Sequence, residues 1–297
     1  MTGNRMTDLT LLLRAEDGTP ISLQEHLQQT EARIRREPTA PEHRWALVEV
    51  LCILGHWDRA LSQLQAWAKW MPQSQAQAHW VRGLIRAEAQ RSEVFSGAMA
   101  PAPVTDMPHW MRDLAKALAH NARAENEEAD VLRSQALAQA PQRAGVCVWQ
   151  RGKDGEQTMQ EQAYEWMADS DTRLGPVCEV MVAGAYRWLA FADVAHLSLQ
   201  APQRLLDLVW MPAKLQLHSE AGLLPTATGR VLHVFLPTRY PIAANASESS
   251  ATHDALLMSR LTRWREVGET GVFAQGQKTW MSEGIDWPLL DVRELRA

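Results

Sequence analysis

Residues 43–72 read HRWALVEVLCILGHWDRALSQLQAWAKWMP, and this stretch decides the fold of the first half of the chain. Apolar residues recur at helical spacing on both sides of Gly55, which favours two amphipathic helices joined by a tight turn. Pro72 cannot continue a helix and therefore ends the second one. The positions expected to face inward are Trp45, Val48, Leu51, Cys52, Trp57, Ala60, Leu61, Leu64 and Ala68.

The proline that closes this pair belongs to a longer spacing. Pro38 and Pro72 lie 34 residues apart, and Pro141 lies 69 residues beyond Pro72, close to two such periods. Tetratricopeptide repeats have this period, with small residues at two fixed positions ahead of the proline. Ala129 and Ala136 fit both positions before Pro141, whereas only one of the two fits before Pro72. The pattern predicts degenerate helical repeats.

Helical signals continue through the rest of the first half. Ser22 followed by Glu25 is the pattern of a capping box, and a proline-bearing loop is expected at 96–108. We therefore predict an all-α, tetratricopeptide-like domain over residues 1–142, with a plain helical bundle as the alternative. Stacked helical pairs of the first kind present a concave surface that can hold a peptide.

The second half of the chain changes its period. Residues 145–152 form a short β-branched and aromatic run, and alternating stretches follow within 175–199, 207–219 and 229–241. Both alternating sets of the last stretch are apolar, which predicts a strand covered on both faces. Because helical repeats precede these strands, the sequence predicts an α+β fold whose mixed, strand-rich C-terminal domain covers residues 143–297.

The remaining C-terminal stretches are less regular. Residues 249–268 read as a helix capped by Thr252 or Asp254, and residues 243–254 read as a polar loop. We expect residues 270–297 to be irregular.

Composition and charge argue against several classes of partner. The 30 basic and 35 acidic residues leave a formal charge of −5 without a basic stripe, which argues against nucleic acid. The three cysteines are isolated, as is typical of buried thiols in a reducing compartment. Neither a signal-peptide core nor a membrane span is present in the sequence. We expect a cytoplasmic protein without a membrane partner.

Charged residues crowd the stretch DSDTRLGPVCEV at 169–180. Carboxylates two residues apart on an extended segment share a face, so Asp169, Asp171 and Glu179 could form the metal site of a hydrolase. A hard cation needs more oxygen ligands, however, and Arg173 is a natural bidentate partner for a carboxylate. We favour a structural network around a turn at Gly175–Pro176, and keep a metal site and direct partner contact as alternatives.

Other signatures of catalysis are missing from the sequence. A G-x-S-x-G elbow, an H-E-x-x-H motif and a phosphate-binding loop are all absent. We therefore expect a protein that is not an enzyme and has neither catalytic residues nor a cofactor.

Two apolar runs, at 205–215 and 236–241, each place an aromatic residue beside a proline. They read either as two strands that end at a turn or as an exposed rim for binding. In the second interpretation the rim is formed by Trp210, Arg239 and Tyr240, which are residue types enriched at binding hot spots.

Several motifs, taken together and in order, resemble one family. They are LCILGHWDRALSQL (51–64), EWMADSDTRLGPVCEV (165–180), YRWL (186–189), RLLDLVWMPA (204–213), PTRYP (237–241), LTRW (261–264) and GQKTW (276–280). The chain resembles the ImpE/SciE/TagJ-type accessory proteins of bacterial type VI secretion over nearly its whole length. It departs from the family pattern at His56, at Ile242 and at Lys278, where the family has arginine.

The resemblance implies a non-enzymatic cytoplasmic adaptor of the contractile sheath. Members of the family bind the N-terminal segment of the small sheath subunit and are linked with the AAA+ ATPase that dismantles contracted sheaths. A metal-dependent hydrolase is the competing hypothesis. The candidate structural or partner-binding residues are Trp166, Asp169, Asp171, Arg173, Glu179, Tyr186, Trp188, Trp210, Arg239 and Tyr240.

Overall fold

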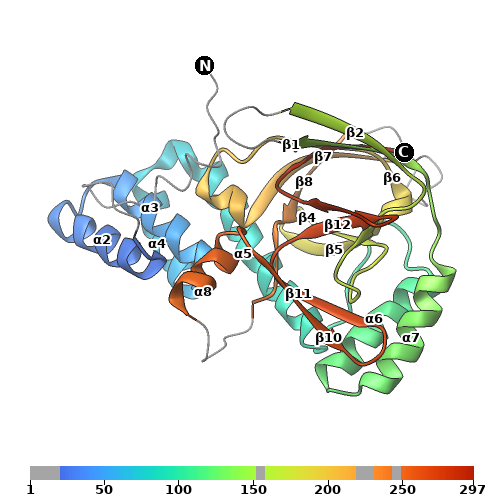
Figure 1. Cartoon of the computed structure of the whole chain (residues 1–297). Coiled ribbons are helices and arrows are strands. Elements are labelled where there is room, and N and C mark those ends of the chain that lie inside the picture. Colours follow the sequence, from blue (N-terminus) through green and yellow to red (C-terminus); the bar gives the residue numbers. More distant parts are fainter. Residues whose placement is uncertain (1–20, 152–157, 219–230, 243–248) are drawn as a thin grey trace.

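Helices form the first half of the chain and strands most of the second, which confirms the α+β class (Figure 1). The computed structural model describes residues 21–151, 158–218, 231–242 and 249–297. The helices of the first half are α2 (Leu23–Arg36), α3 (Pro41–Ile53), α4 (Trp57–Trp70), α5 (Gln75–Phe95), α6 (His109–Ala122) and α7 (Asn126–Gln139).

The helix pair read from residues 43–72 is confirmed as the hairpin α3–α4. Gly55 has a φ of +72°, a conformation that glycine adopts at little cost, and it lies in the turn between the two helices. The capping box at the start of α2 is also present, because Ser22 Oγ accepts from the Glu25 amide and Glu25 accepts from the Ser22 amide. The tetratricopeptide class and the domain boundary at residue 142 stay predictions.

The largest sheet is antiparallel and has the strand order β2-β1-β14-β6-β7-β8-β4-β5. Two small antiparallel sheets, β10-β11-β9 and β13-β12-β3, lie beside it. The first strands are β1 (Gly145–Arg151), β2 (Thr158–Tyr164), β3 (Ala168–Asp169), β4 (Val177–Val182), β5 (Ala185–Ala190), β6 (Val194–Leu199), β7 (Trp210–Leu217), β8 (Leu232–Pro237) and β9 (Arg239–Tyr240).

The C-terminal stretch is more regular than the sequence suggests. The expectation of irregular structure after residue 270 is wrong, since four strands follow there and the last of them enters the middle of the large sheet. The helix expected over 249–268 is too long, because Ser259 adopts a positive φ of +52° and a strand follows. The elements are α8 (Ser250–Leu257), β10 (Thr262–Val267), β11 (Gly271–Gln277), β12 (Thr279–Ser282), β13 (Ile285–Pro288) and β14 (Val292–Arg296).

The cap of α8 also differs from the expectation. Ser249 Oγ accepts from the Thr252 amide, so Ser249 is the N-cap in place of Thr252 or Asp254. Of the polar loop expected at 243–254, residues 243–248 lie outside the described part of the chain, and residues 250–254 belong to the helix.

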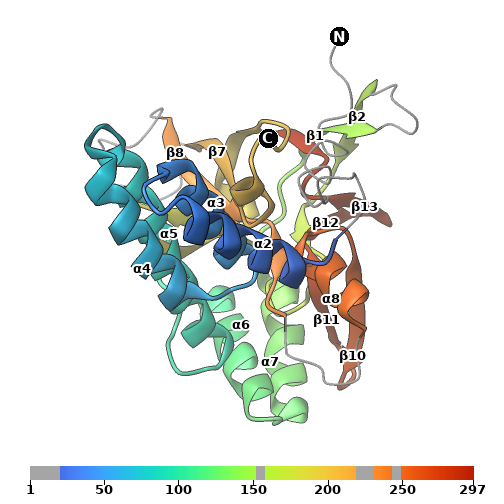
Figure 2. The same cartoon turned by 90° about the vertical axis from the view of Figure 1, so that its left-hand side faces the viewer.

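Helix α5 joins the helical half to the large sheet (Figures 1 and 2). It crosses the turn between β4 and β5, where a Cβ on Gly83 would lie 3.1 Å from Gly184 Cα. The loop after α5 continues along the edge strand β5, since the amides of Val104 and Trp188 donate to the carbonyls of Trp188 and Ala102. Buried apolar residues of both halves belong to one core cluster. Within the described ranges, every helix is too short or too polar to span a membrane.

Within the part of the chain that the structure describes, strand β8 is covered on one face only. Val234 and Leu236 are buried in the core, whereas Phe235 is half-buried and His233 is exposed on the opposite face. Among the described residues, the expectation of a strand covered on both faces is therefore wrong. The uncovered face still carries the apolar residues that led to the expectation, and it forms the floor of a groove described below.

Candidate functional site

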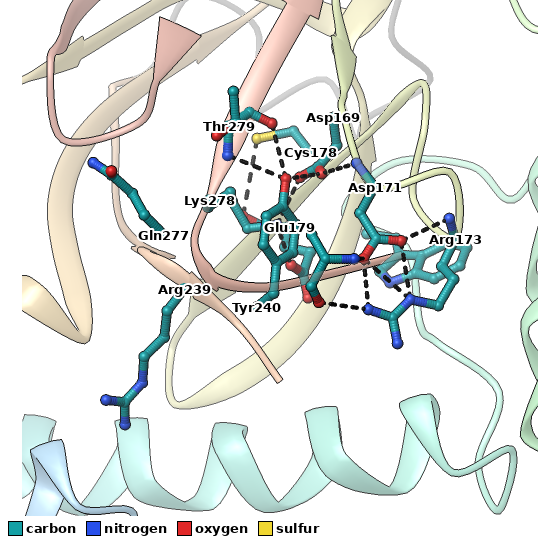
Figure 3. A network of polar contacts seen from close by, with 12 residues as sticks. Asp169, Asp171, Arg173, Cys178, Glu179, Arg239, Tyr240, Gln277, Lys278 and Thr279 are labelled. Carbon is teal, nitrogen blue, oxygen red and sulfur yellow. Dashed lines mark hydrogen bonds and ion pairs between the residues drawn. The ribbon is translucent and has the colours of Figure 1, made fainter. Parts of the chain in front are cut away.

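Lys278, at the junction of β11 and β12, holds together two of the predicted site residues (Figure 3). Its Nζ lies 2.6 Å from Asp169 Oδ2 and 2.6 Å from Glu179 Oε2. Asp169 comes from β3 and Glu179 from β4, and all three side chains are at most 2% exposed. A single buried ammonium group thus bridges two carboxylates that come from different sheets.

Glu179 also binds the helical half of the chain. Arg91 of α5 donates from Nε to Glu179 Oε1 at 2.7 Å and from Nη2 to Oε2 at 3.0 Å, which is a bidentate pair. The Tyr186 hydroxyl donates to Glu179 Oε1 at 2.7 Å, and it accepts from Trp188 Nε1 at 2.7 Å. Both oxygens of this carboxylate are therefore occupied by neighbouring donors.

Two residues of β9 extend the network in opposite directions. The Tyr240 hydroxyl lies 2.7 Å from Asp169 Oδ1 and accepts from the Thr279 amide. The Arg239 side chain points away from the carboxylates (Figure 3) and donates to the carbonyls of Ile53 at 2.7 Å and Leu257 at 2.6 Å. Because these carbonyls lie at the C-terminal ends of α3 and α8, the guanidinium completes hydrogen bonds that both helix ends leave open.

Asp171 and Arg173 form a second pair beside the turn at residues 172–176. Arg173 Nε lies 2.9 Å from Asp171 Oδ1, and Asp171 Oδ2 accepts from the Ala274 amide at 2.9 Å. The Asp171 amide in turn donates to Asp169 Oδ1 at 3.0 Å. This pair fixes the turn that leads into β4 and ties it to β11.

Burial and neighbouring charges shift the pKa values of the two central acids in opposite directions. Burial would raise the pKa of Glu179, but the charges of Arg91 and Lys278 outweigh it and hold that pKa well below its ordinary value. Burial raises the pKa of Asp169 to about 6, against the opposing charge of Lys278 and with the support of nearby Asp171. Lys278 stays charged because the two carboxylates outweigh its burial and raise its pKa.

The geometry of this network suits a structural role better than a reaction. Asp169, Asp171 and Glu179 each face a cation of the chain itself at hydrogen-bonding distance. In the described ranges, groups of three or more acidic, histidine or cysteine side chains that could hold a metal are not found. The network instead connects α5, α3 and α8 to the three sheets.

Of the two interpretations of Trp210, Arg239 and Tyr240, the exposed rim is wrong, because these side chains are only 1%, 7% and 1% exposed. Trp210 instead donates from Nε1 to Glu88 of α5 at 3.0 Å. Trp166 is half-buried and lies two residues before β3. The remaining candidate residues lie within the network.

Sequence reasoning missed the cations at the centre of the network. Arg91 lies 88 residues before its partner Glu179, and nothing in the local pattern of α5 marks it. The sequence does mark Lys278, because this position departs from the resembled family, which has arginine there. An ammonium group lacks the fork of a guanidinium, and here it contacts one oxygen of each carboxylate.

A groove of about 1030 Å³ lies between the helical half and the large sheet. Its walls come from α4, α5 and the turn between β4 and β5, and its floor is the uncovered face of β7 and β8. Trp80 of α5 is 41% exposed, and its ring lies 5.7 Å from the ring of Phe235. The residues that define the groove most clearly are Trp57, Leu61, Trp80, Met181, Pro212 and Phe235.

The register of the strands places the floor residues in rows. Pro212 of β7 lies opposite Phe235 of β8, which in turn lies opposite Met181 of β4. The next row pairs Lys214 with His233, and both side chains are exposed. The floor is therefore apolar next to the β4–β5 turn, and its next row carries the polar His233, which lies opposite Lys214.

The charges around the groove are mostly positive. Arg82 and Arg86 of α5 are exposed and line one wall, and Asp58 is the acidic residue of the lining. Arg86 donates from Nε to the Gly184 carbonyl at 3.0 Å. In a chain with a net charge of −5, this groove is a local basic region.

The comparisons with known proteins together cover almost the whole chain. The family model of the ImpE protein matches residues 161–296. The type VI secretion system accessory component TagJ of Pseudomonas aeruginosa is 31% identical over 273 residues, which are 92% of this chain and 86% of TagJ. The crystal structure of a Vibrio parahaemolyticus protein has a TM-score of 0.74 at 23% identity, over 92% of this chain and 93% of that one, and so shares its fold.

Proposed function

This chain belongs to the family of ImpE and TagJ, and we propose that it is a non-enzymatic adaptor that binds the N-terminal segment of the small sheath subunit of a type VI secretion system. The name of TagJ gives that relative an accessory role in type VI secretion. Because the similarity covers 86% of TagJ, we extend the accessory role to this chain. Such a role requires protein partners within the secretion system.

The observation that carries the proposal is the open groove between α4, α5 and the large sheet. Its lining is mainly apolar and aromatic, with a few charged side chains at the margin, as expected of a surface that binds a short protein segment. Trp57 and Trp80 are of the type that dominates binding energy at protein interfaces. Both halves of the chain contribute to the groove, so both are needed for binding.

Catalysis by the carboxylate cluster is less well supported than binding. A hydrolase that used Asp169, Asp171 and Glu179 would need carboxylate oxygens free to hold a metal or a water molecule. Here each of the three accepts hydrogen bonds from buried cations or amides of the same chain. We infer that the network keeps the two halves in the arrangement that forms the groove.

The proposal includes a cellular setting and a second partner. The adaptor would act in the cytoplasm, and it would connect the sheath to the AAA+ ATPase that dismantles it. The helical hairpins α3–α4 and α6–α7 would then serve as a tetratricopeptide-like scaffold. The first of these hairpins supplies α4 to the groove wall.

The test of the proposal is a calorimetric titration of the full-length chain. The titrant is a peptide that copies the first ~25 residues of the small sheath subunit from the same organism, a length that can form a stable helix on binding. We expect saturable one-to-one binding with a micromolar or lower Kd, and none with a scrambled peptide. If neither heat nor co-purification with the full-length sheath subunit were observed, the proposal would be refuted.

A further inference from the structure

We propose that the open edge of β10 is a second binding surface, which adds an extended acidic segment of a partner protein to the small sheet β10-β11-β9. The partner segment carries an apolar residue between two carboxylates. This surface is separate from the groove that carries the proposed function, because the residues that line the groove come from other elements.

The hydrogen bonds of β11 show which main-chain groups of β10 face the open side. Val272 and Ala274 of β11 turn their main-chain groups away from β10, since their amides donate to side chains of the turn that leads into β4. Their partners in the β10–β11 ladder are Glu266 and Trp264. Hydrogen-bonded and non-hydrogen-bonded pairs alternate in an antiparallel ladder, so these two pairs are of the second kind. The N–H and C=O groups of Trp264 and Glu266 therefore point away from β11.

These main-chain groups form a template for another strand. Among the described residues they have no hydrogen-bond partner, and β10 has β11 as its one neighbouring strand. Figure 2 shows β10 at the margin of the molecule. Proteins often cover such an edge, as the loop after α5 does at β5, or interrupt it with a proline or a bulge. Strand β10 contains no proline and pairs in regular register with β11 over its six residues.

Trp264 provides an aromatic anchor in the middle of this edge. Its side chain is 42% exposed, and its ring lies edge-on to the ring of Tyr240, with 6.1 Å between the centroids. Tyr240 is itself held by its hydrogen bond to Asp169. An exposed indole that is already fixed in place loses little freedom on binding, and tryptophan is enriched among residues that dominate binding energy. A β-branched or aromatic residue of an added strand would pack against it.

The other face of β10 selects carboxylates. Side chains alternate along a strand, so Arg263 and Arg265 share the face opposite to Trp264. Arg265 is exposed, and its guanidinium lies 5.9 Å from the centre of the Phe273 ring. It forms no ion pair with a described residue. Arg260, two residues before the strand, is also exposed, so the first part of this edge is basic in a chain with a net charge of −5.

The charges also decide between the possible occupants of the edge. Antiparallel pairing with a second copy, centred on Trp264, would place Arg263 opposite Arg265, and like charges in opposite positions are destabilising. An acidic strand meets the same arginines with carboxylates. The sequence acidic–apolar–acidic places both carboxylates on the arginine face and the apolar residue on the Trp264 face. Glu266 and Glu269 are exposed at the far end of β10, so the partner's carboxylates belong near the arginines.

The experiment uses the full-length chain and a defined peptide as the probe. The probe is the end-blocked, fluorescently labelled peptide Gly-Thr-Glu-Val-Glu-Val-Thr-Gly, and its control has lysine in place of both glutamates. In fluorescence anisotropy, we expect saturable binding of the acidic peptide at submillimolar concentrations and at least tenfold weaker binding of the lysine peptide. Equal binding of both peptides, or none of the acidic one, would overturn the proposal. Displacement of the acidic peptide by a single-stranded oligonucleotide would assign the edge to nucleic acid and also overturn it.

Two variants of the edge are compared with matched variants elsewhere. Trp264→Ala should weaken binding of the acidic peptide at least tenfold. Arg265→Glu should weaken it at least fivefold and strengthen binding of the lysine peptide, an exchange that a loss of folding cannot produce. Trp70→Ala on α4 and Arg112→Glu on α6 change exposed residues of the same types and should stay within twofold. Normal affinity of both edge variants would overturn the proposal.

The addition of a strand is tested with two N-methylated forms of the acidic peptide. One form carries methyl groups on one alternating set of amides, and the other form on the remaining set. In an added strand, one set donates to β10 and the other points away from it. One form should therefore bind at least tenfold more weakly, and the other should stay within twofold. An equal effect of both forms would contradict strand addition.

The failure of this proposal and that of the proposed function are distinguishable. The sheath peptide should bind Arg265→Glu as it binds the wild type, and it should not displace the acidic peptide. Displacement would place both peptides at one site and overturn the second surface. Binding of the acidic peptide without binding of the sheath peptide would overturn the proposed function alone. A wild-type dimer that Trp264→Ala converts to a monomer would assign the edge to a second copy of the chain and overturn the inference.

Discussion

Replacing Lys278 with methionine should destabilise the fold more at pH 8 than at pH 5.5. The substitution keeps much of the side-chain volume and removes the ammonium group that bridges Asp169 and Glu179. Loss of one partner from a buried ion pair costs about 3–5 kcal/mol. Because one ammonium group serves two carboxylates here, we expect the cost at pH 8 to lie in the upper part of that range.

The dependence on pH follows from Asp169. In the wild type its pKa is about 6, above the ordinary value, so its contribution to stability is full at low pH and is lost as the pH rises through 6. Without Lys278 this pKa rises further, so the variant continues to lose stability above pH 6. Each pH unit in that window is worth about 1.4 kcal/mol for one proton, and the difference between the proteins should grow by about 2 kcal/mol from pH 6 to 8.

The assay is urea unfolding followed by circular dichroism at both pH values, with Lys69→Met as the control. Lys69 is an exposed lysine on α4, so its loss should change the free energy of unfolding by less than about 0.5 kcal/mol. A cost for Lys278→Met below about 1 kcal/mol at pH 8 would refute a central structural role for the bridge. An equal cost at both pH values would refute the assignment of the pH dependence to Asp169.

Three further predictions follow from single features of the fold. Burial raises the pKa of Glu49 on α3 to about 7, so wild-type stability should fall as the pH rises through 7. Glu49→Gln should therefore reduce the drop in Tm between pH 6 and 8. An equal drop in both proteins would contradict the assignment of this pH dependence to Glu49. Gly276 has a φ of +85°, and a Cβ there would collide with the Leu261 carbonyl, so Gly276→Ala should lower the free energy of unfolding by about 2–3 kcal/mol. Gly284→Ala is the matched control for positive φ without a collision and should cost less in the same urea titration. Treatment with a chelator should leave both Tm and peptide binding unchanged, because the carboxylates pair with cations of the chain; a fall in Tm would indicate a bound metal.

The sequence predicts the local elements well where their period is long and regular. The α3–α4 hairpin follows from helical spacing around Gly55, and β1 follows from a short run of β-branched residues. Of the strands after residue 270, β12, β13 and β14 have only four or five residues each, and β11 contains a glycine near its end, so their patterns are too short or too interrupted to predict. Strand β10 is largely exposed, so it also lacks the alternation that marks a half-buried strand.

The candidate site is predictable only in part. The crowding of Asp169, Asp171, Arg173 and Glu179 indicates a polar network, but the partners that decide its role are distant in sequence. Arg91 reaches Glu179 across 88 residues, and that contact exists only once α5 lies on the sheet. Burial of Trp210 is likewise a tertiary property, since the same residue types suit both an interface and a core.

The groove cannot be predicted from the sequence for the same reason. Its walls come from α4 and α5 and its floor from β7 and β8, so no single stretch contains it. The one local signal is the apolar character of both faces of β8. That signal predicts burial on both faces, and the described residues leave one of these faces open.

The measurement that tests the central claim most directly is site-specific photo-crosslinking to the full-length small sheath subunit. A photoreactive residue replaces His79, which lines the groove and is exposed, and in a control protein it replaces the exposed Arg265 of β10. We predict that position 79 crosslinks to the N-terminal segment of the sheath subunit and that position 265 does not. Crosslinks from position 265 alone, or none from position 79 although the two proteins co-purify, would contradict binding in the groove.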